Sequence, residues 1–281
     1  MKPSRLASIA LHLAAVAFAA VILAPIAWMV LLSVSSTKDL TTLPFRWIPA
    51  ELDLSRYAEL IHYADNTRGK AFLLALRNTI TVAAGTTAVA LVCAVPAAWS
   101  FSRFRGRQSP LLGVVIAIYM MPATAIVVPL YRILSGAGLL NTPIGLILVD
   151  CTLVLPFAIW LMKSNFDAVP SEIEEAAFVD GAGVLKTLWL VTLPMVRPAL
   201  ATTALFAILN VWDEFLYAFI FTSDSRAQTL VVTIANLASG RESDYGLLAT
   251  AGLLTALPPI LIGIVLQRTL VSGLAQGGIK G

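Results

Sequence analysis

The sequence predicts an all-α integral membrane protein with six transmembrane helices. Of its 281 residues, 58% are hydrophobic and only 12% are charged, and the mean hydropathy is +0.86. This balance lies far from that of a soluble globular chain. A helix needs about twenty apolar residues to cross the hydrocarbon core of a bilayer. Six stretches meet this need, at residues 9–32, 78–99, 111–134, 143–162, 198–221 and 246–266.

The first stretch is predicted to be a retained helix. Lys2 and Arg5 precede it, as in a secretory signal. Its apolar core is too long for a signal, however, and continues through Pro25 to Trp28 without a small-residue cleavage site.

The third stretch is predicted to be interrupted twice, at Met121-Pro122 and at Val128-Pro129. Proline lacks a backbone N–H and its ring clashes with the preceding turn, so it kinks or breaks a helix. Tyr119, next to the first break, is a candidate for lining a path, although aromatic residues in a membrane helix more often pack.

The basic residues predict that both termini are cytoplasmic. Six spans place the two ends on one side, and lysines and arginines gather in short cytoplasmic loops. Lys2 and Arg5 mark that side, and so do Arg103, Arg105 and Arg107 after the second span. The loop between the fourth and fifth spans is then cytoplasmic as well.

This cytoplasmic loop is predicted to contain a short helix. Ser171 and Glu174 fit a capping box, in which the serine accepts from the amide of residue 174 and the glutamate reaches back to the amide of residue 171. Gly181 or Gly183 would end the helix in a left-handed conformation. The alanines and Phe178 of this helix suit a surface that a partner protein approaches closely. The residues alone leave open a second interpretation, a surface helix packed on its own membrane domain.

The loop also matches a spaced pattern: EAA, three residues, Gly, nine residues, Ile, one residue, Leu-Pro, with Val191 in place of the isoleucine. The matching residues are Glu175, Ala176, Ala177, Gly181, Leu193 and Pro194. In this the chain resembles the binding-protein-dependent ABC importer permeases of type I. With Asp180 directly before the glycine, the motif resembles the form that is usual in the carbohydrate-uptake branch.

Two further segments carry the same resemblance. Residues 212–216, Trp-Asp-Glu-Phe-Leu, resemble the W-N-E-F-L element of the sugar branch, with Asp213 in place of the commoner asparagine. Gln267-Arg268 and the closing residues 277–281 resemble its C-terminal tail. The likeness covers residues 72–281 and is greatest to the maltose-permease G-type subunit, the second permease of a heterodimeric pair.

The resemblance implies the type I importer permease fold, with a coupling helix that inserts into a cleft of an ATP-hydrolysing subunit. Residues 1–70 would form an N-terminal transmembrane helix and an extracytoplasmic segment, residues 71–270 the permease domain, with the EAA loop at about 163–197, and residues 271–281 a cytoplasmic tail. The residues implied to form the joint with the ATPase are Glu175, Ala176, Ala177, Asp180 and Gly181, with Leu193 and Pro194 bracing the return to the membrane.

The same resemblance implies the partners and the location. They are a second, homologous permease subunit, two ATP-binding subunits that hold ATP and Mg, and an extracytoplasmic solute-binding protein. The chain itself is expected to bind no cofactor and to lie in the bacterial plasma (inner) membrane. A disaccharide or oligosaccharide is the expected solute, with polyols and glycerol-phosphate compounds as alternatives.

Acidic residues in the spans form a second candidate site. A charge at the bilayer centre costs at least about 2.5–3.5 kcal/mol on insertion scales, and Asp150, Asp213 and Glu214 lie within or at the edge of apolar stretches. They would face a substrate path, or cap a helix break, or pair with Arg132 or a partner subunit; the role of Asp150 stays open. The candidate path residues are Tyr119, Asn210, Trp212, Asp213, Glu214 and Tyr217.

Other functions are disfavoured by what the sequence lacks. No G-x-x-x-x-G-K-[S/T] pattern is present, so we expect no ATP hydrolysis by this chain. His12 and His62 are isolated, which argues against a metal site, and no nucleophile–base arrangement suggests a catalytic site. The bases form no stripe, which argues against nucleic acid. An ion-coupled secondary transporter would use the intramembrane acids as relay groups, but it has no need of the docking loop.

Overall fold

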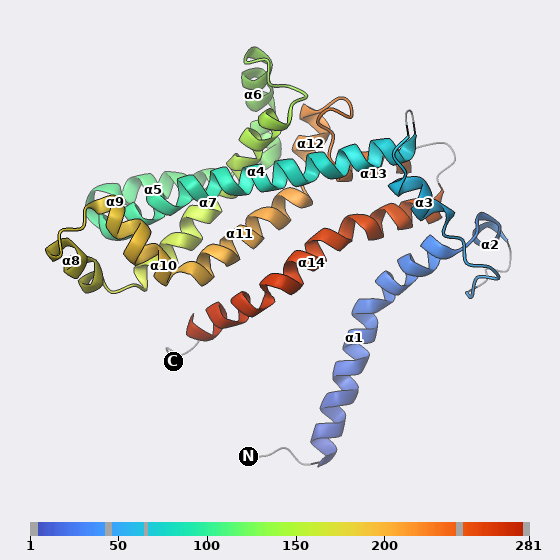
Figure 1. The fold of residues 1–281 in the computed structure, drawn as a ribbon, viewed down its shortest axis with the longest axis horizontal. Helices are drawn as coiled ribbons and strands as arrows, with labels where there is room; N and C mark the ends of the chain where they lie inside the picture. Colours follow the sequence, from blue (N-terminus) through green and yellow to red (C-terminus); the bar gives the residue numbers. More distant parts are fainter. Residues whose placement is uncertain (1–4, 43–46, 65–66, 240–243, 278–281) are drawn as a thin grey trace. The chain divides into compact units, whose positions relative to one another are not determined.

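The computed structural model describes the backbone of residues 5–42, 47–64, 67–239 and 244–277, and their side chains except at 5–7, 105–109 and 266–277. The described residues are almost entirely helical (Figure 1). The chain forms two compact units, Met1–Leu73 with Ile234–Leu257, and Leu74–Thr233 with Pro258–Gly281. Each unit is described separately below.

Four helices are long and apolar enough to cross a membrane, and two bent pairs raise the number of candidate spans in the described residues to six. The four single helices are α1 (Arg5–Val34), α4 (Arg68–Arg103), α7 (Pro143–Asp167) and α14 (Tyr245–Gly277). Each contains one of the predicted stretches. The expected all-α membrane fold is therefore confirmed.

The third predicted span consists of two helices, α5 (Arg105–Tyr119) and α6 (Ala123–Gly136). They are bent by 98° relative to each other, and the change of direction between them is visible in Figure 1. Pro122 is the N-cap of α6, where its missing N–H leaves no intrahelical bond unmade. The break predicted at Met121-Pro122 is confirmed. The predicted interruption at Val128-Pro129 does not end the helix, because Pro129 lies inside α6 and a single lost hydrogen bond bends a helix without ending it.

The fifth predicted span is also divided, into α11 (Arg197–Trp212) and α12 (Leu216–Phe221). Before α11 come α9 (Val184–Thr187), a π-helical turn (Leu188–Thr192) and α10 (Leu193–Met195), and this leading segment is bent by 83° relative to α11. The short helix α13 (Leu230–Ala238) follows α12. Within this unit α7 contacts α5, α6, α11 and α12 and is the centre of the packing.

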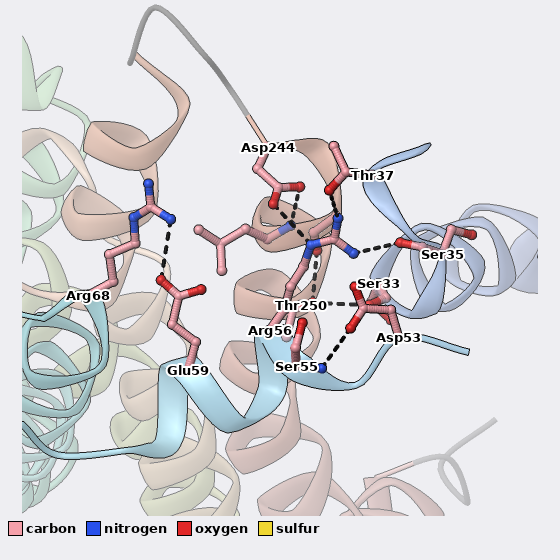
Figure 2. A network of polar contacts seen from close by, with 12 residues as sticks. Ser33, Ser35, Thr37, Asp53, Ser55, Arg56, Glu59, Arg68, Asp244 and Thr250 are labelled. Carbon is pink, nitrogen blue, oxygen red and sulfur yellow. Dashed lines mark hydrogen bonds and ion pairs between the residues drawn. The ribbon is translucent and has the colours of Figure 1, made fainter. Parts of the chain in front are cut away.

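In the unit that contains α1, a buried arginine joins segments that are distant in sequence. Arg56 lies on α3 (Ser55–Ile61) and donates to the Ser35 carbonyl at 2.6 Å, to Thr37 Oγ1 at 2.9 Å and to Asp244 Oδ2 at 3.0 Å. Thr37 opens α2 (Thr37–Thr41), and Asp244 precedes α14 (Figure 2). A buried arginine is tolerated where its donors are satisfied and its charge is paired, and Arg56 meets both conditions.

Candidate functional site

The loop between α7 and α11 contains the predicted short helix, α8 (Ser171–Val179). It begins where predicted, but the predicted capping box is wrong. Pro170 is the N-cap and no side chain caps the helix. The Glu174 carboxylate is bonded elsewhere, as described below. Glu172 and Glu174 still lie in the first turn, where a negative charge favours the helix N-terminus.

The C-terminus of α8 is closed by a Schellman motif. The amide of Gly181 donates to the Phe178 carbonyl at 3.0 Å, and the amide of Ala182 donates to the Ala177 carbonyl at 2.9 Å. Gly181 has a φ of 81°, a conformation that glycine adopts without steric cost. Of the two glycines proposed for this role, Gly181 therefore ends the helix. Gly183 has an ordinary φ of −75°.

Glu174 attaches α8 to the rest of the unit. It is only 3% exposed, and its carboxylate accepts from Arg103 Nε at 2.8 Å, Arg103 Nη2 at 2.9 Å, Trp99 Nε1 at 3.0 Å and Thr192 Oγ1 at 2.8 Å. Burial alone would raise the pKa of Glu174, but these hydrogen bonds and the charge of Arg103 outweigh it and lower the pKa below its ordinary value. The site therefore holds a carboxylate anion.

The surroundings of this carboxylate connect three helices. Arg103 Nη2 also donates to the Val169 carbonyl at 3.0 Å, just after α7. At the ends of α4 and α7, Ser102 Oγ donates to Asp167 at 2.7 Å and Lys163 pairs with Asp167 at 2.6 Å. The same unit contains an apolar core formed by α4, α7 and the segment before α11. Its buried members are Ala94, Val95, Ala98, Trp99, Ala158, Ile159, Met162, Phe166, Val169, Leu188 and Val196.

The predicted coupling residues lie mostly on the outside of the loop. Glu175, Ala176, Asp180 and Gly181 are exposed, while Ala177, Leu193 and Pro194 are half-buried. Leu193 packs on the apolar core, and Pro194 lies in the first turn of α10. The motif therefore has two groups of residues. The exposed residues, Glu175, Ala176, Asp180 and Gly181, form its outward group, and the half-buried residues, Ala177, Leu193 and Pro194, lie closer to the rest of the unit.

Apolar side chains are exposed beside the outward group. Phe178 is 42% exposed and Val179 is 87% exposed at the end of α8, and Val184 and Leu185 on α9 are also exposed. Exposed apolar side chains that lie together, unlike single ones, indicate a contact surface. We call these four residues the apolar tip of the loop.

Sequence reasoning missed the role of Arg103, Trp99 and Thr192 and misassigned that of Glu174. Glu174 directly precedes the motif, and Thr192 is its unspecified position between Val191 and Leu193. No local signal set Glu174 apart, because Glu172 and Glu175 on the same helix are acidic as well.

The candidate path residues do not share one environment. Trp212 and Tyr217 are buried, whereas Asn210 and Asp213 are exposed at the break between α11 and α12. Asn210 donates to the Phe206 carbonyl of its own helix at 3.0 Å. Tyr119 is on a different helix, and its ring centroid lies 5.8 Å from that of Phe157.

Glu214 serves as a cap at that break. Its carboxylate accepts from the amides of Tyr217 at 2.7 Å and Ala218 at 2.9 Å, in the first turn of α12. These amides have no intrahelical acceptor. The capping interpretation of Glu214 is thus confirmed, and no ion pair joins Glu214 or Asp213 to Arg132 in the described residues.

Asp150 is the most deeply buried acid of the spans. It is 1% exposed on α7, and its Oδ1 has no hydrogen-bond partner within the described part of the chain. No group of three or more His, Cys, Asp and Glu side chains there is placed to hold a metal ion. Unlike Glu174, Asp150 is therefore a buried acid within a span with one carboxyl oxygen that makes no hydrogen bond in the described part of the chain.

Comparison with known proteins identifies the fold of which this loop is a part. A family model described as the binding-protein-dependent transport system inner membrane component matches residues 87–276. The trehalose/maltose transport system permease protein of Thermococcus litoralis is 30% identical, with 100% of each chain covered. The trehalose transport system permease protein of Mycobacterium tuberculosis is 32% identical, with 92% of this chain and 93% of the relative covered.

A solved structure agrees with these relatives. It is the crystal structure of a bacterial ABC transporter involved in the import of the acidic polysaccharide alginate, and one of its chains superimposes with a TM-score of 0.80 at 25% identity, covering 95% of this chain and 99% of the other. The chain has the fold of an ABC importer permease, and it belongs to the family of binding-protein-dependent transport system inner membrane components.

Proposed function

We propose that this chain is one of two homologous permease subunits of an importer that moves a sugar across the membrane, driven by ATP hydrolysis on two partner subunits. The observation that carries the proposal is the construction of α8. The helix is closed by its own backbone at Gly181, is attached through the buried Glu174, and exposes the apolar tip. We call α8 the docking helix.

The apolar tip favours docking on a partner over packing on the chain's own membrane domain. Only Glu174 on α8 is buried, whereas Phe178 and Val179 are exposed. An aromatic side chain that fills a pocket contributes strongly to an interface. The partner is the ATP-binding subunit, which would hold ATP and Mg, while the outward motif residues Glu175, Ala176, Asp180 and Gly181 line the contact.

The proposed arrangement in the membrane follows the basic residues. The docking helix and both termini lie in the cytoplasm, residues 1–70 carry the first span and an extracytoplasmic segment, residues 71–270 form the permease domain, and residues 271–281 form a cytoplasmic tail. From the resemblance to the maltose-type permeases, we also propose that this tail reaches toward the ATP-binding subunits. The side chains of residues 266–281 lie outside the described residues.

The proposed solute is a disaccharide or an oligosaccharide delivered by an extracytoplasmic binding protein. Support comes from the relatives, which are named for trehalose, maltose and alginate transport. A further solved relative is an alginate ABC transporter in complex with a periplasmic protein that holds an alginate pentasaccharide. Asn210 and Asp213, exposed at the break after α11, are the residues we place on the sugar path. Identification of the solute that co-purifies with the binding protein tests the choice of sugar.

Site-directed cross-linking tests the docking helix. Both natural cysteines, Cys93 and Cys151, are first replaced by alanine, and a single cysteine is then placed at Val179 or at Tyr63. Both positions are exposed, but Tyr63 lies in the proposed extracytoplasmic segment. We expect a short cross-linker to join Val179→Cys, and not Tyr63→Cys, to the ATP-binding subunit. An intact complex with no adduct at position 179 would refute the docking role, and adducts at position 63 would refute the orientation.

A further inference from the structure

Arg103 and Glu174 form the strongest directional contact between the docking helix and the membrane helices. The guanidinium presents Nε and Nη2 to the two carboxylate oxygens at 2.8 and 2.9 Å, a bidentate arrangement that fixes orientation as well as distance. The side chains are 14% and 4% exposed. Water therefore competes little for these hydrogen bonds, and the two side chains keep a fixed orientation relative to each other.

The same guanidinium is also linked to the end of α7, once directly and once through Ser102 of its own helix. Nη2 donates to the Val169 carbonyl at 3.0 Å, and Nη1 lies 3.3 Å from Ser102 Oγ, which in turn donates to Asp167. Arg103 is the last residue of α4, and Asp167 is the last residue of α7. One planar, rigid group thus joins the ends of two membrane helices to α8.

The other contacts of α8 are less able to transmit a displacement. Trp99 and Thr192 each donate one hydrogen bond to the Glu174 carboxylate, but these single bonds from neutral donors are weaker than the bidentate bond from the guanidinium. Ile173 and Ala177 are half-buried and apolar, and apolar contacts are non-directional, so side chains can slide across them. A bidentate charge pair breaks when one partner moves out of its plane. Movement of α8 must therefore carry the end of α4 with it or sacrifice a buried ion pair, which is costly.

We propose that Arg103 is the positioning residue that transmits movement of the docking helix to α4, so that the Arg103–Glu174 pair couples ATP hydrolysis to transport. This inference rests on the proposed function. Arg103 need not touch ATP, the ATPase or the sugar. Its role is to keep α8 and α4 moving as one body.

The test uses the complete importer in liposomes, with its binding protein and ATP-binding subunits. Two quantities are measured: the amount of ATP-binding subunit that co-purifies, and the amount of solute taken up per ATP hydrolysed. The principal variant is Arg103→Lys, which keeps the charge but cannot form the planar fork. The exposed carboxylate of Glu172 on the same helix provides the control Glu172→Gln, and Glu174→Gln removes the other half of the pair.

We expect Arg103→Lys to retain the ATP-binding subunit and to lower the uptake per ATP by about tenfold, the factor associated with one lost hydrogen bond to a charged group. Glu174→Gln should lower it at least as much, and Glu172→Gln should not. In a double-mutant cycle, the combined variant should show no further loss beyond the larger single effect. Non-additivity of this kind would identify one shared interaction.

The outcomes separate the two proposals. If no ATP-binding subunit accompanies the unmodified chain, the proposed function itself fails. If the subunit remains bound and Arg103→Lys transports as much solute per ATP as the unmodified chain, only the positioning role is overturned. Loss of the ATP-binding subunit from Arg103→Lys would also overturn it, because Arg103 would then shape the docking surface instead of transmitting its movement.

Discussion

Arg56 packs its guanidinium directly against the backbone of Gly246, leaving no room for a Cβ atom. Gly246→Ala would push the guanidinium out of its position and break its bonds to Ser35, Thr37 and Asp244. We expect the free energy of unfolding to fall by about 1–3 kcal/mol, the cost of leaving buried polar groups unpaired. Thermal unfolding of the purified permease in detergent measures it.

Gly263 provides the control for that substitution. It lies on the same helix, α14, and no atom would lie within 4 Å of the Cβ of an alanine at this position. Gly263→Ala should therefore be neutral or stabilising by up to about 1 kcal/mol. Equal effects of the two substitutions would show that Arg56 yields easily and that its hydrogen bonds contribute little.

The attachment of the docking helix should depend on pH. The folded-state pKa of Glu174 is lowered from its ordinary value of 4.5. The carboxylate therefore stabilises the loop fully above that value, and this stabilisation is lost as the pH falls through the lower, folded-state pKa. Hydrogen exchange of residues 171–179, corrected for intrinsic rates, should show constant protection at pH values above 4.5 and a progressive loss of protection as the pH falls below that value.

Glu174→Gln should remove this step. Protection in that variant should be weak throughout the range, because the amide cannot replace the anion opposite Arg103. Glu175→Gln, at the exposed neighbouring carboxylate, should keep the step. Loss of the step in the second variant would assign the pH dependence to the wrong residue.

Gly181→Ala should weaken the docking helix at its C-terminus. A φ of 81° costs an alanine about 1–2 kcal/mol, so the Schellman motif should open part of the time and the apolar tip should lose its fixed position. We expect less ATP-binding subunit to co-purify and uptake to fall. Gly183→Ala is the matched control, since Gly183 has a φ of −75° and open space around it. A loss equal to that of Gly181→Ala would argue against the conformational explanation.

Asp213 and Glu214 should differ although they are adjacent. Glu214→Ala removes the cap of α12 and should lower stability by about 1 kcal/mol together with uptake. Asp213 is exposed, so Asp213→Ala should lower uptake and leave the thermal unfolding temperature unchanged. Full uptake by the Asp213 variant, at normal assembly, would remove this residue from the sugar path.

The helices of this protein could be predicted because hydropathy over about twenty residues is a local property. The break at Pro122 could be predicted for the same reason. The continuation of α6 through Pro129 could not, because whether proline ends or only bends a helix depends on the neighbouring packing. The division of the fifth span at Asp213 also carries only a weak local signal, an acidic pair after a tryptophan.

The location of the coupling loop could be predicted, but its attachment could not. Ser171 and Glu174 have the spacing of a capping box, and nothing local excludes one. Glu174 instead accepts from Arg103, which is 71 residues away in the sequence. Arg56 and Asp244 are 188 residues apart in the sequence, and no pattern in the sequence predicts that they form a pair. Buried charge pairs of this kind depend on the tertiary fold, which a single sequence does not display.

The burial of the Arg103–Glu174 pair also constrains how the gene can change. Replacement of either residue alone by an uncharged one leaves an uncompensated charge in a largely dry site, a condition that costs several times more than loss of an exposed pair. Mutations at codon 103 would thus persist mainly when codon 174 changes as well. In the descendants of this gene the two positions should covary, while the exposed Glu172 drifts independently.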